Sequence, residues 1–286
     1  MKIPMRPVNA LLVASTLLAL LPSDLSAKRL EWQTDWAAAF EQARAEQKPV
    51  FVNFYAEWCG PCRAMRRTTL IDPRVTEQLE RFVLLAVDVG SPRSLEKHGL
   101  PGVPYYSIRD PWERDVVSFL GYHEARSFGP QVAAVADARS AIIDTGLILR
   151  SGDSAQAWRQ RAAIAQSAGQ EASARHCYLK AAAAAAAAQD PNLESVMKIE
   201  AALTLVRGDR TLIGAGMREL EAMLDSYTSP EVLAATWLAI GFAEEHRRRP
   251  KAAREAYAHG LELAPKGTPL ADQLTAKLEG LGKRKK

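Results

Sequence analysis

Two cysteines, Cys59 and Cys62, are separated by two residues and directly follow an apolar run at residues 50–55. The run is rich in β-branched and aromatic residues and predicts a buried strand, and the residues after the cysteines predict a helix that Pro73 interrupts. At this spacing one sulfur lies at the helix N-terminus and the other one turn in, on the same face. Free amide groups and the positive end of the helix dipole stabilise a thiolate at the first position. A strand that leads into a dithiol at a helix start therefore constrains the fold more than any other feature.

The spacing of the two cysteines predicts a redox-active disulfide, Cys59–Cys62. We expect Cys59 to be the nucleophile and Cys62 to be the resolving thiol that attacks the mixed disulfide and releases the product. Pro61 limits the freedom of the loop between them, and Gly60 allows a tight turn. Trp58 is expected to shield one side of the sulfurs. These five residues form the predicted catalytic loop.

A zinc half-site and a structural disulfide are the alternative interpretations of the cysteine pair. Zinc requires four ligands, and the sequence contains neither a second cysteine pair nor a cluster of cysteine and histidine. No metal is therefore expected, and no cofactor either, because no flavin or nicotinamide motif is present. The third cysteine, Cys177, is expected to be a buried, inert thiol, with a regulatory role as the alternative.

Strand-like and helix-like segments alternate over residues 28–147. The patterns predict helices at 32–46 and about 127–145, and strands at 50–55, 82–89, 103–108 and 116–120. This order predicts an α/β sandwich, in which helices flank a mixed sheet.

Residues 51–63, with the motif Trp-Cys-Gly-Pro-Cys, resemble the active-site strand, loop and helix of the thioredoxin family. Residues 99–104, Gly-Leu-Pro-Gly-Val-Pro, resemble the family's Gly-x-x-Gly-Val-Pro segment. The resemblance implies that Pro104 is a cis-proline facing the dithiol. It also implies that the backbone of Val103 pairs with an extended substrate peptide, a form of strand addition.

The segment at residues 68–75, before and after Pro73, resembles a subgroup of the thioredoxin family. This subgroup is related to the electron-receiving C-terminal domain of the membrane disulfide reductase. The resemblance covers about 110 residues. A reductase outside the cytoplasm needs an electron source, and this chain has no flavin or nicotinamide motif, so a membrane reductase is the expected donor.

Two positions depart from the thioredoxin pattern. The family's buried acid lies six residues before the first cysteine, where this chain has Asn53, which does not titrate. A lysine that often neighbours that acid is replaced by Leu84. Deprotonation of Cys62 then needs water or another carboxylate. Glu57 is the nearest carboxylate in the sequence and the candidate for proton transfer, with an exposed loop charge as the alternative interpretation.

The N-terminal residues have the pattern of a secretory signal peptide. Lys2 and Arg6 precede an apolar run at residues 8–21, and a small-residue exit ends at Ala27. The run is shorter than the ~20 residues that a membrane-spanning helix needs. We expect residues 1–27 to be cleaved and the protein to reach the periplasm or an equivalent compartment, with an uncleaved N-terminal anchor as the alternative.

Residues 148–286 are rich in alanine and predict helices almost throughout. Two segments that begin near Ala155 and Ala234 resemble the 34-residue tetratricopeptide repeat. The first has matching residues at Trp158, Ala162, Gly169, Ala174, Tyr178 and Ala181. The second has them at Trp237, Ile240, Gly241, Ala253, Tyr257, Gly260 and Pro265. An atypical copy with an insertion is expected between them. The resemblance implies a concave face that binds proteins, with a plain helical bundle as the alternative.

These features predict an exported thiol–disulfide oxidoreductase that acts on disulfides of exported proteins. The alternative function is a non-catalytic adaptor that docks partners through its thioredoxin fold and repeats. The net charge of +4 depends on a basic C-terminal tail, residues 283–286, so a nucleic-acid partner is not expected. The direction of the redox reaction stays open at this point.

Overall fold

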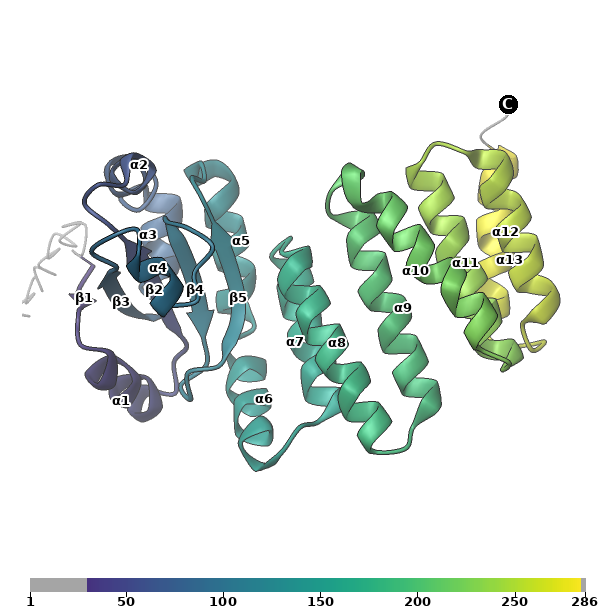
Figure 1. Cartoon of the computed structure of the whole chain (residues 1–286), viewed down its shortest axis with the longest axis horizontal. Helices are drawn as coiled ribbons and strands as arrows, with labels where there is room; N and C mark the ends of the chain where they lie inside the picture. Colours follow the sequence, from purple (N-terminus) through teal and green to yellow (C-terminus); the bar gives the residue numbers. More distant parts are fainter. Residues whose placement is uncertain (1–29, 284–286) are drawn as a thin grey trace, which may run out of the picture.

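A mixed five-stranded sheet forms the N-terminal half of the computed structural model, which describes residues 30–283 (Figure 1). The strand order is β1-β3-β2-β4-β5, in which β1, β3 and β2 are parallel and β4 and β5 are antiparallel to their neighbours. The strands are β1 (Trp32–Gln33), β2 (Val50–Tyr55), β3 (Val83–Asp88), β4 (Tyr105–Arg109) and β5 (Asp115–Leu120). The predicted mixed sheet is confirmed. The predicted signal peptide and the last three residues of the basic tail lie outside the described residues.

Helices cover both faces of the sheet, because β2 in its centre is apolar on both sides. Val50, Val52 and Phe54 point to one face, where α1 packs, and Phe51 points to the other, where α2, α3 and α5 pack. The helices of this half are α1 (Trp36–Glu46), α2 (Gly60–Thr68), α3 (Pro73–Leu79), α4 (Ser94–Lys97), α5 (Ala125–Asp137) and α6 (Arg139–Ser151). This arrangement places the start of α2 at the end of the central strand.

Three predicted boundaries differ from the structure. Trp32 lies in β1 rather than in the first helix, which begins later because the Asp35 side chain caps it by accepting a hydrogen bond from the Ala38 N–H at 2.9 Å. The third strand begins after Pro104, not before it. The single helix predicted at residues 127–145 is broken at Ala138, so α5 packs on the sheet while α6 turns away and contacts the next helix.

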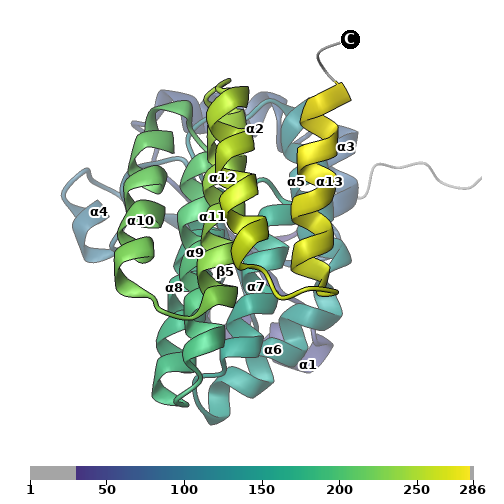
Figure 2. The same ribbon diagram turned by 90° about the vertical axis from the view of Figure 1, so that its right-hand side faces the viewer.

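Seven long helices follow, stacked as antiparallel neighbours (Figures 1 and 2). They are α7 (Ala155–Ser167), α8 (Glu171–Ala187), α9 (Pro191–Arg207), α10 (Ile213–Ser226), α11 (Pro230–His246), α12 (Pro250–Leu263) and α13 (Pro269–Lys283), with the short helix η1 (Arg210–Leu212) before α10. Small residues allow close packing: a Cβ at Gly241 would lie 2.2 Å from the ring of Tyr257. No helix among residues 30–283 is long and apolar enough to cross a membrane.

The predicted insertion between the two repeat-like segments is not a single loop. Helix pairs begin at Ala155, Pro191 and Pro230, so the extra residues are divided between the two intervals. They lengthen α8 and α9 to 17 residues each and form η1. The middle pair, α9 and α10, occupies the region in which the sequence predicts an atypical copy.

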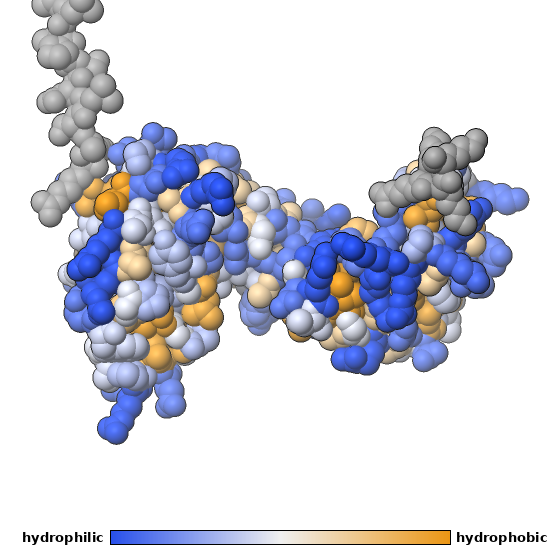
Figure 3. Space-filling view, turned by 90° about the horizontal axis from the view of Figure 1, so that it is seen from above, coloured by the Kyte–Doolittle hydropathy of each residue, from blue (hydrophilic) through white to orange (hydrophobic). Residues whose placement is uncertain are grey.

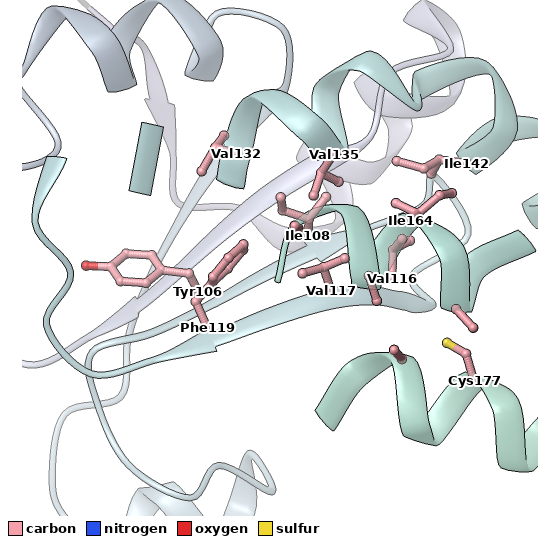
Figure 4. Packing of buried hydrophobic residues seen from close by; sticks show 14 of the residues in the cluster. Tyr106, Ile108, Val116, Val117, Phe119, Val132, Val135, Ile142, Ile164 and Cys177 are labelled. Atoms are coloured by element: carbon pink, nitrogen blue, oxygen red, sulfur yellow. The ribbon is translucent and has the colours of Figure 1, made fainter. Parts of the chain in front are cut away.

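One hydrophobic core extends from the sheet into the first helix pair (Figure 4). Val116 and Val117 of β5 share this core with Ile164 of α7 and with Cys177 of α8. Cys177 is a free thiol and is buried, as predicted. Burial raises its pKa to about 11, so it stays protonated and unreactive at neutral pH.

A buried ion pair also joins the two parts of the chain. The Arg161 guanidinium of α7 bonds to the Asp110 carboxylate that follows β4, and both side chains are fully buried. Arg161 also donates to Thr145 of α6, and Asp110 accepts backbone N–H bonds from Trp112 and Arg114. These bonds satisfy most polar atoms of the pair. The ion pair and its hydrogen bonds therefore fix α7 against the sheet, in addition to the apolar contacts.

Candidate active site

Cys59 and Cys62 lie where β2 ends and α2 begins, and they form a disulfide. Their sulfur atoms are 2.05 Å apart and their Cα atoms 5.3 Å apart. Cys59 is the N-cap residue of α2, and its sulfur accepts a hydrogen bond from the Cys62 N–H at 3.1 Å. Pro61 occupies the first turn of the helix, where no intrahelical N–H donor is needed. The Cys59 sulfur is therefore directed at the unsatisfied amides of the helix start, the position that favours a thiolate.

The peptide bond between Val103 and Pro104 is cis and lies beside the disulfide. The Cys59 sulfur is 3.5 Å from the carbonyl oxygen of Val103. The carbonyl of Pro104 accepts a hydrogen bond from the Gly121 N–H at 2.8 Å, which joins this loop to the end of β5. Residues that are more than forty positions apart in the chain thus meet at the dithiol.

Exposed apolar side chains flank the ends of the strands and α2 on this side of the domain. Trp58 is 47% exposed, and its indole N–H donates to the Gly90 carbonyl at 2.6 Å. Leu120 and Tyr122 are about half exposed. The hydroxyl of Tyr122 lies 3.4 Å from that of Thr68 on α2. Sequence reasoning missed Leu120 and Tyr122, although their position around a glycine at the end of the last strand is a usable signal.

Asn53 lies on β2 between Ala86 of β3 and Tyr106 of β4. Its side-chain oxygen is buried and has no hydrogen-bond partner within residues 30–283. Asn53, Cys62 and Arg66 line a mostly apolar cavity of about 630 Å³ beside α2. None of the described residues that line this cavity carries a carboxylate, so no carboxylate on this side of Cys62 can accept the proton of its thiol.

Glu57, the candidate for proton transfer, is an exposed loop residue. Its carboxylate pairs with the Arg66 guanidinium at 3.4 Å, and both side chains are more than half exposed. Its carbonyl accepts a hydrogen bond from Arg63 at 2.6 Å. The structure gives Glu57 no direct contact with Cys62 among the described residues, so its role in proton transfer stays a prediction. Leu84, which replaces the lysine of the thioredoxin pattern, is buried in β3.

No cluster of metal-ligating side chains occurs in the part of the chain that the structure describes. His123 stacks on Phe128, and its backbone N–H lies 3.2 Å from the sulfur of Met65 on α2. Burial lowers the pKa of His123, so its neutral form is favoured.

The family model described as thioredoxin-like matches residues 31–111. Residues 31–111 belong to a thioredoxin-like domain. The match ends after β4, and the last strand and α5 complete the sheet and its outer layer beyond it.

The thioredoxin-like domain is related to thiol:disulfide interchange proteins named DsbD. The protein of Salmonella paratyphi A is 33% identical over 94 residues, which are 30% of this chain and 16% of that protein. The protein of Klebsiella pneumoniae is 33% identical over 138 residues, 41% of this chain and 23% of the relative. The chain thus spans less than a quarter of the length of these relatives.

Solved structures similar to the thioredoxin-like domain include the oxidised C-terminal domain of DsbD from Neisseria meningitidis. The two chains are 29% identical, and the match covers 35% of this chain and 94% of the Neisseria chain, with a TM-score of 0.30. A thioredoxin from Thermus thermophilus is 28% identical, covers 39% of this chain and 91% of that chain, and has a TM-score of 0.35.

The structure brings together most of the predicted site residues. Cys59, Cys62, Pro61 and the Val103–Pro104 bond of the thioredoxin-like domain lie within one small region. Gly60 is the first residue of α2, and Trp58 is fixed beside this region through its bond to Gly90. Glu57 lies apart, paired with Arg66. Their roles in substrate binding and catalysis remain predictions.

Proposed function

We propose that the chain is an exported thiol–disulfide oxidoreductase that reduces or exchanges disulfides of exported proteins. The observation that carries this proposal is the Cys59–Cys62 disulfide at the N-terminus of α2, with the Cys59 sulfur 3.5 Å from the Val103 carbonyl at a cis-proline. The relationship of this domain to thiol:disulfide interchange proteins supports the same chemistry.

In the reducing direction, the Cys59 thiolate attacks one sulfur of a substrate disulfide. A mixed disulfide forms and the other substrate sulfur leaves as a thiolate. The Cys62 thiolate then attacks the Cys59 sulfur, releases the second substrate thiolate and closes the Cys59–Cys62 disulfide. The substrate gains two electrons and the dithiol loses two. Extended substrate backbone beside Val103 would hold the target disulfide in line with Cys59.

The closed disulfide must be reduced again before a second turnover. We infer that a membrane disulfide reductase supplies these two electrons, since the relatives of the domain are thiol:disulfide interchange proteins. The signal-like pattern of residues 1–27 supports export to the periplasm or an equivalent compartment, where protein disulfides persist.

We also propose that residues 148–286 form a tetratricopeptide-like module that binds a partner protein. Antiparallel helix pairs and the close contact of Gly241 with Tyr257 support this assignment. Repeats of this kind form extended concave surfaces, which suit protein ligands.

Reduction of insulin disulfides, with dithiothreitol as the reductant, tests the redox function. We expect Cys59→Ser to reduce the rate to the uncatalysed level, and Cys62→Ala to accumulate mixed disulfides with substrate proteins. Identification of those trapped proteins would name the substrate. A wild-type rate equal to that of both variants would favour the second candidate function, a non-catalytic adaptor.

A further inference from the structure

An apolar groove of about 570 Å³ lies between α9, α11 and α13. Its lining includes Val196, Leu203, Leu238, Phe242, Leu270 and Ala276. Val196 is 41% exposed, although it is a large apolar residue within a helix. Apolar surface of this kind, gathered in one groove, marks a place where another chain binds.

A basic cleft lies at one end of α11, with a volume of about 410 Å³. Its basic side chains are Arg210, His246, Arg247, Arg248 and Arg249. Arg247 pairs with Glu244 at 2.8 Å. None of the ion pairs between described residues includes Arg210, Arg248 or Arg249. The cleft therefore has an excess of positive charge.

Basic residues at a helix C-terminus are common, because they complement the helix dipole. That effect accounts for Arg247, which directly follows α11. The cleft also contains Ile213 and Gly214, the first residues of α10. The positive end of the α10 dipole thus opposes the negative end of the α11 dipole, so the charges of Arg210, Arg248 and Arg249 are left as an excess. This excess favours an anionic ligand.

The groove and the cleft adjoin at α11, where a residue of one contacts a residue of the other. Ala235, Leu238 and Phe242 of the groove are followed on the same face by His246, which lies in the cleft and packs on the Phe242 ring at 4.2 Å. Arg207 and Lys277 lie over the other side of the groove, 5.7 Å and 5.5 Å from the Phe242 ring centre. Seen from above, the helical half shows a hydrophobic patch with hydrophilic side chains around it (Figure 3).

The dimensions of this surface suit a short peptide segment. The distance along α11 from Ala235 to His246 is about 16 Å at 1.5 Å per residue. An extended chain covers that distance with about five residues. Charges inside the groove are already paired, Arg207 with Glu200 and Lys277 with Glu245, so only the cleft end selects for charge.

We propose that the adjoining groove and cleft together bind an extended segment of a partner protein, in which two or three apolar residues are followed by acidic residues. The apolar side chains enter the groove between α9, α11 and α13, and the carboxylates meet Arg210, Arg248 and Arg249. This inference rests on the proposal that the helical region binds a partner protein, and it does not depend on the dithiol. Loss of peptide binding with intact insulin reduction would contradict only the proposed peptide surface. Loss of insulin reduction with intact peptide binding would contradict only the proposed redox function.

Fluorescence anisotropy with a labelled hexapeptide of three apolar and three acidic residues tests the surface on the full chain. We expect saturable binding that weakens as salt rises, because the cleft contacts are screened. A peptide with lysines in place of the acidic residues should bind at least about tenfold more weakly. Equal binding of the two peptides, or no binding of the acidic one, would overturn the proposal.

Two variants locate the binding site. Arg248→Glu combined with Arg249→Glu should weaken the acidic peptide by about tenfold, since reversal of two exposed charges costs about 1.4 kcal/mol. Val196→Glu, at an exposed groove position, should weaken both peptides. The matched control is Arg159→Glu combined with Arg254→Glu, two exposed arginines outside the surface. Unchanged affinity in the cleft variant, with its circular dichroism spectrum intact, would place the peptide elsewhere and refute the proposal.

Discussion

The thioredoxin-like domain and the helical region depend on their sequences in different ways. In the first, a few atoms at the end of β2 determine the site: the Cys59 cap of α2 and the carbonyl of Val103. In the second, the fold depends on many small-residue contacts, of which Gly241 against Tyr257 is the tightest. Chemistry at a few atoms produces a short, specific motif, whereas packing spreads its signal over many positions. We therefore expect substitutions at a few positions of the thioredoxin-like domain to change activity. Substitutions at many positions of the helical region should change stability.

The contact between the two regions should show the largest structural effect. Arg161→Met leaves the Asp110 carboxylate buried without its partner, and we expect a loss of about 3–5 kcal/mol in the free energy of unfolding. Urea denaturation followed by circular dichroism measures this loss. The double variant Arg161→Met with Asp110→Asn should recover part of it, because no uncompensated charge remains. An unchanged stability in the single variant would show that the two regions are not joined through this pair.

Gly241→Ala tests the distributed packing of the helical region. The added methyl group meets the Tyr257 ring, and we expect a loss of about 1–3 kcal/mol through overpacking. Thermal unfolding measures the loss. Gly280→Ala is the matched control, since nothing lies within 4 Å of a Cβ at Gly280. The rate of insulin reduction per folded molecule should not change. A lower rate would contradict the idea that packing in the helical region leaves the redox site unaffected.

Asn53→Asp tests the local sensitivity of the redox site. The new carboxylate lies in the cavity that Cys62 lines and can accept the proton of that thiol. We expect insulin reduction to become up to about tenfold faster and its pH–rate profile to gain an ionisation. Asn53→Leu, which does not titrate, is the control. An identical pH–rate profile in the Asp variant would contradict the idea that this position limits proton transfer.

His123 should give the smallest effect, on stability alone. Burial lowers its pKa in the folded state, so the unfolded chain binds the proton more readily. The neutral side chain thus contributes stability that is fully present above the unfolded pKa of about 6.5 and is lost as the pH falls through the lower folded value. In thermal unfolding at pH 7.5 and pH 5, His123→Phe should lose less stability on acidification than the parent protein does. An equal loss in both would rule out this histidine as a source of acid sensitivity.

Local patterns predicted the elements that depend on near neighbours. The run at residues 50–55, the cap at Cys59 and the alanine-rich helices are all determined within a few residues of the chain, and the structure has them where the sequence places them. The exceptions have local causes that compete with helix propensity. Asp35 caps α1, which begins four residues later than predicted, and the predicted helix at residues 127–145 is interrupted at Ala138, so that its two halves contact different parts of the fold.

By itself, the sequence determined the dithiol, the four strands β2 to β5 in their order, and the helical character of residues 148–283, because each is encoded in short-range spacing. Only the tertiary structure decided that Arg161 meets Asp110, that one core joins the sheet to α7 and α8, and that Phe242 and His246 connect an apolar groove to a basic cleft. These contacts join residues from separate elements, and no periodicity records them. They depend on which faces remain to be buried once the local elements have formed.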